Sequence, residues 1–211
     1  LENKVIIHKI ELESSEILIQ IGDIHGNYHA LMVLLEHFKK KGILSKQLEV
    51  IGDHVLCFCG DYISRSVLSI ETIFLLLILL DKNENKIFIV SGNHESIEKM
   101  HVEYGFYDEL QEEVESIDDD LSKRYALNAL YIKFLKLFCL LPKGYLFTYD
   151  GMEKNNTVMC THGSWDLDNN GDPLEYNKST IYDDTRYARL SDIKYAIFIY
   201  PSKDGDPNLI E

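Results

Sequence analysis

Long apolar runs, basic residues and cysteines are all scarce in this sequence of 211 residues. The longest apolar run, residues 73–80, is far shorter than the ~20 residues that a membrane span needs, so it predicts a buried helix and no membrane span. Lys and Arg number 21 against 35 Asp and Glu, which gives a net charge of −14. Because so acidic a chain repels phosphate groups, we expect no nucleic-acid partner.

The spacing of the four cysteines fits neither a C-x-x-C motif nor a disulfide framework. All four lie in apolar stretches, as is typical of reduced thiols in a protein core: Cys57, Cys59, Cys139 and Cys160. Reduced thiols indicate a reducing compartment, and we therefore expect a cytoplasmic protein. Asn, Lys and Ile are frequent, and a microbial protein secreted into a host cytoplasm is the alternative.

The chain does contain enough apolar residues for a substantial core. Hydrophobic residues make up 45% of it, and the length predicts a single domain over residues 1–211. Short β-branched runs predict strands at residues 17–21, 55–59, 87–89, 145–149, 157–161 and 193–200. Apolar residues at helical spacing predict helices at 28–41, 67–80 and 125–141. The alternation of strands and helices indicates an α/β fold.

Residues with metal-binding side chains follow four of the expected strands. After the first strand come Asp23 and His25, which project to the same side of extended backbone and can therefore bind one ion. Asp61 and His162 follow two later strands. Oxygen and nitrogen ligands without thiolate suit Mn, Fe or Zn. Two such ions sharing a carboxylate can clamp a phosphate group and lower the pKa of a bridging water.

Three further residues can complete the site, either as metal ligands or as substrate contacts. Asn93 and His94 are neighbours after the strand at 87–89, so in extended backbone one can face a metal and the other a substrate. Arg65 lies at the start of an expected helix, where its planar guanidinium can hold phosphate oxygens. These residue types favour metal-assisted chemistry at phosphorus.

The motifs that contain these residues resemble the metal-binding signatures of the calcineurin-like metallophosphoesterases. The matching segments are GDIHGN (22–27), GDYISR (60–65), GNHE (92–95) and THG (161–163). The segment YGFYDEL (104–110), with Phe138, Cys139 and residues 141–142, is similar to the phosphoprotein phosphatase (PPP) family of serine/threonine phosphatases. The resemblance covers about residues 17–165. It implies an α/β sandwich of two mixed β-sheets flanked by helices.

The resemblance also implies a cofactor, namely two divalent metal ions. Mn is the expected metal, with Fe and Zn as alternatives. Asp23, His25 and Asp61 would bind the first ion, and Asp61, Asn93 and His162 would bind the second. Asp61 would therefore bridge the two ions.

The activity implied by the resemblance is that of a protein phosphatase. It would hydrolyse phosphoserine and phosphothreonine monoesters by attack of a metal-bridging hydroxide, with phosphotyrosine as a further substrate. His94 would act as the general acid that protonates the departing alkoxide. Arg65 and Asn93 would bind the phosphoryl group. The expected partner is a phosphoprotein, and no oligomeric state follows from the sequence.

Three departures from the family pattern stand out. Ser64 replaces an acidic residue that orients the catalytic histidine; its hydroxyl can orient His94 but supplies no charge. Ser164 follows Gly163 where the family has a second glycine. The family also takes one more His and one more Arg from a later segment, so we expect the domain to be incomplete at its C-terminus, Glu211.

These departures leave alternatives open. A dinucleoside polyphosphatase or another small-molecule phosphatase shares the metal motifs, and a pseudophosphatase binding module is suggested by Ser64 and the absent His. His54 is the first candidate to replace that His, although its segment has the composition of a loop. The acidic residues between 112 and 120 are typical of a solvated helix face, and a surface that selects basic substrates is the alternative.

Overall fold

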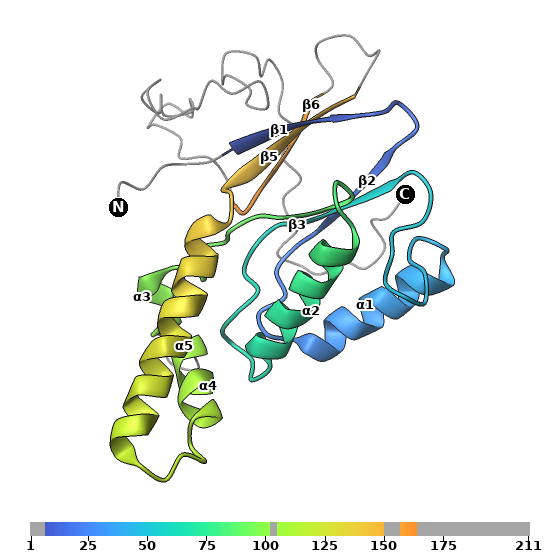
Figure 1. The fold of residues 1–211 in the computed structure, drawn as a ribbon. Coiled ribbons are helices and arrows are strands. Elements are labelled where there is room, and N and C mark those ends of the chain that lie inside the picture. The colour runs from blue at the N-terminus through green and yellow to red at the C-terminus, as the bar shows by residue number, and fades with distance from the viewer. Residues whose placement is uncertain (1–6, 102–104, 150–156, 164–211) are drawn as a thin grey trace, which may run out of the picture.

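Two three-stranded sheets form the framework of the computed structural model, which describes residues 7–101, 105–149 and 157–163 (Figure 1). The first sheet has the order β1-β5-β6, with β1 parallel to β5 and β5 antiparallel to β6: β1 (Ile7–Leu12), β5 (Gly144–Tyr149) and β6 (Thr157–Thr161). The second sheet has the order β2-β3-β4 and is parallel: β2 (Ile17–Ile21), β3 (His54–Phe58) and β4 (Ile87–Ile89).

The described residues also form helices, which gather into two groups. These helices are α1 (Tyr28–Lys40), α2 (Ser69–Lys82), α3 (Ile97–Met100), α4 (Phe106–Glu113) and α5 (Asp120–Leu140). Figure 1 shows α1 and α2 side by side next to the second sheet, while α3 and α4 lie along α5. The connections β2-α1-β3 and β3-α2-β4 are helical crossovers, which is why these three strands run parallel.

Alternation along β3 assigns its two faces to two separate cores. Val55 and Cys57 pack with residues of the first sheet, in a cluster that includes Phe147. Leu56 and Phe58 point the other way and belong to the larger cluster shared with the helices. All four of these β3 side chains are fully buried, so β3 is the central strand of the described molecule.

Most element boundaries agree with the sequence prediction, and the exceptions have local causes. The expected helix at 28–41 is α1, whose N-cap residue Asn27 accepts a hydrogen bond from Ala30 N at 3.0 Å. The helix expected at 125–141 begins earlier, at Asp120, because the Asp119 carboxylate caps it by accepting from Ser122 N at 2.7 Å.

The α/β sandwich predicted from the sequence is confirmed. Its first sheet is mixed, whereas the described strands of its second sheet are all parallel. Strand β1 was not predicted, and the strand expected at 193–200 lies outside the described residues. Within the described ranges no helix combines the length and apolar character of a membrane span. One domain over residues 1–211 stays a prediction.

The acidic residues between 112 and 120 are exposed, as expected of a solvated face. They lie at the end of α4, in the following connection and at the start of α5. Figure 1 shows this connection at the end of α5 that is distant from the sheets. The alternative of a substrate-selecting surface at the strand ends is therefore not supported.

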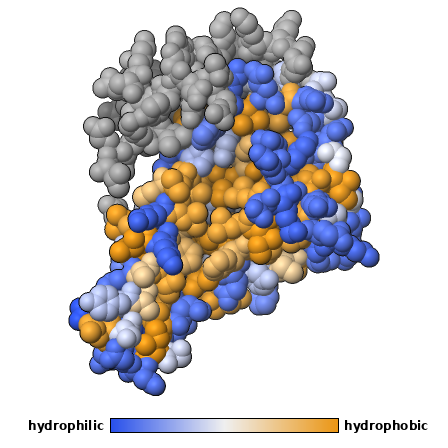
Figure 2. All heavy atoms as spheres, viewed as in Figure 1, coloured by the Kyte–Doolittle hydropathy of each residue, from blue (hydrophilic) through white to orange (hydrophobic). Residues whose placement is uncertain are grey.

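All four cysteines are free thiols, but they do not all lie in the core. Cys57 and Cys160 are buried and Cys59 is half-buried, which agrees with the prediction. The prediction is wrong for Cys139, which is exposed on α5. An apolar stretch that forms a helix turns some of its residues outward, because successive side chains point in different directions around the axis. Figure 2 shows hydrophobic side chains at the surface in the region of α5.

The hydroxyl of Tyr62 ties the end of β3 to the end of β4. Tyr62 is fully buried, and its hydroxyl oxygen lies 2.8 Å from Phe58 O and 2.7 Å from Val90 O, to one of which it donates. It also accepts from Gly60 N and Val90 N, both at 3.1 Å. Burial raises the pKa of the Tyr62 phenol well above its usual value, so it remains protonated and able to donate.

Removing this hydroxyl should destabilise the fold. In Tyr62→Phe, buried backbone groups of the strand ends lose their partner, and we expect the free energy of unfolding in urea to fall by about 1–3 kcal/mol. Tyr125→Phe, on the exposed face of α5, is the matched control and should change it by less than about 0.5 kcal/mol. Equal effects of the two substitutions would contradict this role of Tyr62.

Candidate metal centre

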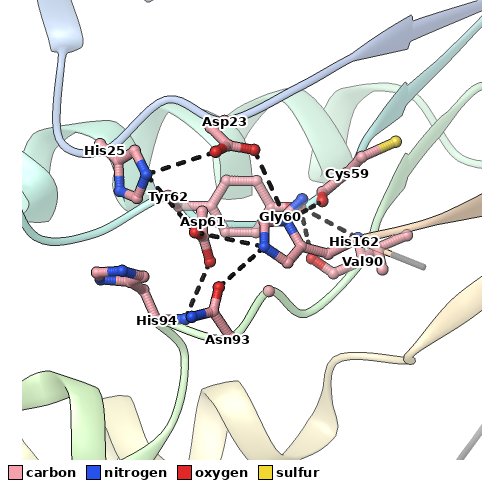
Figure 3. A network of polar contacts seen from close by, with 12 residues as sticks. Asp23, His25, Cys59, Gly60, Asp61, Tyr62, Val90, Asn93, His94 and His162 are labelled. Carbon is pink, nitrogen blue, oxygen red and sulfur yellow. Dashed lines mark hydrogen bonds and ion pairs between the residues drawn. The ribbon is translucent and has the colours of Figure 1, made fainter. Parts of the chain in front are cut away.

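The polar residues singled out in the sequence meet at one edge of the second sheet. The carboxyl ends of its parallel strands lie at the same edge, and the end of β6 from the other sheet joins them. Figure 3 shows their side chains pointing toward one another. The residues brought together are Asp23, His25, Asp61, Asn93, His94 and His162.

Asp61 lies at the centre of this arrangement. Its side chain is buried, and its Oδ2 atom lies 3.5 Å from His25 Nε2 and 3.4 Å from His162 Nε2. Asp23 spans the same two rings, with Oδ2 3.5 Å from His25 Nε2 and Oδ1 3.7 Å from His162 Nδ1. Two groups of potential ligand atoms result, each within 4.8 Å: His25, Asp61 and His94, and Asp23, Asp61 and His162. Asp61 is the residue that the two groups share.

His25 and His162 are oriented as histidines that bind metals usually are. The Nδ1 atom of His25 faces Ile63 O at 3.1 Å, and that of His162 faces Cys59 O at 2.9 Å. The opposite nitrogen of each ring is therefore directed at the carboxylates. His25 Nε2 is buried and has no hydrogen-bond partner among the described residues. Carboxylates and imidazoles without thiolate, with one orphaned nitrogen, fit two divalent cations that share Asp61.

Asn93 adds an amide to the same centre. Its side-chain oxygen lies 2.9 Å from His162 Nε2. With the amide turned over, its nitrogen would instead donate to both carboxylate oxygens of Asp61 at 3.1 Å. Either orientation keeps Asn93 at the His162 side of Asp61, the place that the sequence prediction gave it.

The Glu95 carboxylate holds the turn after β3 against the turn after β4. It is buried and accepts hydrogen bonds from the backbone of Asp61 at 2.9 Å, Tyr62 at 2.8 Å and Gly92 at 2.7 Å. Burial raises the pKa of Glu95, and these three N–H groups oppose that rise. A Cβ atom at Gly92 would lie 2.2 Å from Asp61 Oδ1, so only glycine allows this approach. The GNHE motif alone does not predict this contact of Glu95.

His94 and Arg65 form the side of the site away from His162. His94 is buried, and its Nε2 atom lies 3.4 Å from Arg65 Nη2. Burial lowers the pKa of His94, while the nearby Asp61 carboxylate raises it. Arg65 is exposed and adopts a left-handed backbone conformation with φ of 66°. A substrate could therefore contact both residues at once.

Ser64 does not play the orienting part that its position suggested. Its side chain is fully buried, but neither its hydroxyl nor His94 Nδ1 has a hydrogen-bond partner among the described residues. Ser64 N instead donates to Ser69 Oγ at 3.2 Å. Ser69 Oγ donates to Glu109, whose carboxylate also accepts from Ser69 N at 2.8 Å and Ile70 N at 3.3 Å. Glu109 thus caps α2 and supports the turn that carries Arg65.

His54 lies away from this centre. It begins β3, and its Nδ1 atom faces Ile51 O at 2.8 Å. The potential metal-binding groups formed by the described residues do not include it. The structure therefore gives no support to His54 as a replacement ligand.

Comparison with known proteins points to one family. The family model of calcineurin-like phosphoesterases matches residues 18–206. The chain is 34% identical over 163 residues to the serine/threonine-protein phosphatase 6 catalytic subunit of Caenorhabditis elegans, covering 75% of this chain and 40% of that protein. It is 30% identical over 142 residues to the serine/threonine-protein phosphatase 4 catalytic subunit of Kluyveromyces lactis, covering 67% and 37% respectively. The chain thus spans about two fifths of the length of these relatives.

A solved structure shares the fold. It is a protein serine/threonine phosphatase from Saccharomyces cerevisiae with similarity to human phosphatase PP5. Its TM-score against this chain is 0.56 at 24% identity, and the match covers 86% of this chain and 48% of the other. This likeness concerns the arrangement of strands and helices.

The Glu95 contacts predict a specific effect of Glu95→Gln. A glutamine offers one acceptor oxygen in place of two, and its NH2 group would face the N–H donors. We expect the free energy of unfolding to fall by about 1–3 kcal/mol and amide hydrogen exchange to become faster at Asp61 and Tyr62. Glu113→Gln, on the exposed end of α4, is the control. Unchanged exchange at both amides in Glu95→Gln would show that Glu95 does not hold the turn.

Proposed function

Because the chain belongs to the calcineurin-like phosphoesterase family, we propose that it is a metal-dependent phosphatase acting on phosphoserine and phosphothreonine side chains of proteins. The observation that carries this proposal is the position of Asp61, which belongs to both groups of ligand atoms. A shared carboxylate is what a pair of cations working on one phosphate requires. The relatives named above are protein phosphatases, which supports the substrate class.

The family implies a site for two metal ions, and we assign its ligands from the motifs that carry the resemblance. The groups of neighbouring ligand atoms pair His25 with His94 and Asp23 with His162 around Asp61, and Asp23 also lies 3.5 Å from His25 Nε2. Asp23, His25 and Asp61 would hold one ion, and Asp61, Asn93 and His162 the other. Mn is the metal we expect, and Fe and Zn suit the same donors. When bound, such ions neutralise phosphate charge and lower the pKa of a bound water.

His94 and Arg65 are the residues that we assign to the phosphate ester itself. Arg65 is exposed and can donate to phosphate oxygens through its guanidinium. His94 lies 3.4 Å from it, so an ester held by Arg65 places its leaving oxygen near the imidazole. The lowered pKa of His94 makes its protonated ring a stronger acid toward the departing alkoxide and at the same time reduces the fraction of rings that are protonated at neutral pH. Asn93 would contact the same phosphate from the opposite side.

The metal assignment predicts different losses for two variants. Asp61→Asn should lose both Mn ions, because it weakens the shared ligand, whereas His162→Ala should lose only one. The metal content of each variant after desalting, measured by plasma mass spectrometry, tests this. His54→Ala is the control and should keep the content of the unmodified chain.

Two results would contradict the metal assignment. One is Asp61→Asn that retains one tightly bound ion while hydrolysing p-nitrophenyl phosphate normally. The other is equal metal loss in Asp61→Asn and His54→Ala. A chain that binds two ions but never turns over would support a pseudophosphatase instead.

The substrate class is tested by a direct comparison. We expect kcat/KM for a phosphoserine or phosphothreonine peptide to exceed that for diadenosine tetraphosphate by about tenfold or more, because the relatives named above are protein phosphatases. That factor corresponds to about 1.4 kcal/mol of transition-state binding. Both assays use the same Mn concentration. A phosphotyrosine peptide should also react, since its phenolate leaves without a proton from His94. His94→Asn should therefore slow hydrolysis of this peptide less than hydrolysis of the phosphoserine peptide. Preference for the dinucleotide would overturn the proposed substrate class.

A further inference from the structure

Three cysteine sulfurs converge beside the site, where the proposed function does not use them. Cys57 lies in β3, Cys59 follows β3 directly, and Cys160 lies in β6 of the other sheet. Their sulfur atoms all lie within 4.8 Å of one another. Cys57 and Cys59 are two residues apart on extended chain, so both side chains face the same sheet. We refer to these three residues as the thiol cluster.

The thiol cluster adjoins the two strand ends that supply Asp61 and His162. Cys59 is two residues before Asp61, and Cys160 is two residues before His162. The carbonyl of Cys59 lies 2.9 Å from His162 Nδ1, as Figure 3 shows. A Cβ atom at Gly60 would lie 2.9 Å from the Cβ of His162, so the two segments are in direct contact. A shift in the cluster would therefore reach the ligands.

The surroundings of the cluster favour a neutral product over a bound metal ion. Cys57 and Cys160 pack in an apolar cluster that includes Phe88 and Phe147. Gln20 brings a neutral amide to it, with Nε2 2.7 Å from Cys160 Sγ. Three thiolates around one cation would leave a net negative charge in this apolar space, which is costly. A disulfide carries no charge.

We propose that the thiol cluster is an oxidation site at which hydrogen peroxide forms a disulfide between Cys59 and Cys160. Cys59 reacts first because it is half-buried, whereas Cys57 and Cys160 are enclosed. Its sulfur attacks one peroxide oxygen, the O–O bond breaks, and a sulfenic acid and one water form. The Cys160 sulfur then attacks the Cys59 sulfur and the hydroxyl leaves as a second water. Two thiols lose two electrons and two protons, and one peroxide becomes two waters.

Cys160 is a better partner for Cys59 than Cys57 is. Two residues apart on one extended strand, Cys57 and Cys59 have Cα atoms about 6.6 Å apart, near the upper limit that a disulfide allows. Their bond would have to bend the chain immediately before Asp61. Cys160 approaches from the facing sheet, as in disulfides that join two packed sheets. Cys57 remains as a third thiol that can exchange with the bond.

The disulfide should disturb the metal ligands. Sulfurs that are up to 4.8 Å apart must close to about 2.05 Å. Metal–ligand distances tolerate changes of only about 0.2 Å. We therefore expect weaker metal binding by Asp61 and His162 and lower turnover after oxidation. This effect on turnover rests on the proposed phosphatase function, whereas formation of the bond does not.

Disulfide mapping tests the bond without any activity assay. The full chain is treated with hydrogen peroxide, the excess is removed with catalase, and free thiols are alkylated. Chymotrypsin cleaves after Phe58 and so separates Cys57 from Cys59 before mass spectrometry. We expect a linked pair containing Cys59 and Cys160 that disappears with dithiothreitol. Cys139→Ser, which alters the exposed cysteine, should give the same pair.

Three outcomes would overturn the proposal. They are a link that requires Cys139, oxidation of Cys59 to sulfinic acid with no link, and alkylation-resistant thiols in a chain that carries one zinc ion held by the cluster. Cys57→Ala should still form the bond and Cys59→Ser should not. The reverse pattern would show that Cys57 is the reacting thiol.

A second measurement separates this inference from the proposed function. Peroxide treatment should lower turnover of p-nitrophenyl phosphate by about tenfold, and dithiothreitol should restore it. Cys59→Ser should keep its own turnover through the same treatment, which shows that the loss does not come from oxidation of the metals. A disulfide in a chain without turnover would reject the proposed function and keep this inference. Turnover without a disulfide would keep the proposed function and reject this inference.

Discussion

The buried Glu95 carboxylate is the contact on which the geometry of the site depends. Its two oxygens satisfy three backbone N–H groups in the turns after β3 and β4. These turns carry Asp61, Asn93 and His94, which must keep fixed distances if they are to act together. A charged group buried so deeply is costly unless every oxygen is hydrogen-bonded. Because burying the Glu95 charge is offset only while all three N–H groups donate to it, the two turns are held in one arrangement.

The site also depends on packing between the two sheets. Three of its strands belong to the parallel sheet, but His162 follows β6 of the mixed sheet. The apolar contacts of Val55 and Phe147 between the sheets set how close His162 comes to Asp61. Tyr62 adds a polar tie at the ends of β3 and β4. The expected metal ligands and the thiol cluster thus both lie where the two sheets meet.

The sequence was most informative where chemistry is local. The strands at residues 17–21 and 157–161 and the residues Asp23 and His162 at their ends are where the patterns predicted them. The metal-binding motifs predicted that Asp61 and His162 meet. The supporting contacts of Glu95 and Glu109 were not predictable, because a buried carboxylate looks like any other acidic residue in a turn or helix. Cys160 meets the cysteines near β3 only because the two sheets pack together. The spacing of the cysteines along the chain does not reveal that packing.

Anomalous diffraction can show whether two metal ions share Asp61. Crystals of the full chain grown with Mn would be measured on both sides of the Mn absorption edge. We expect two anomalous peaks about 3.5–4 Å apart, one on each side of the Asp61 carboxylate, the first beside His25 and the second beside His162. A single peak, or peaks that do not contact Asp61, would contradict it.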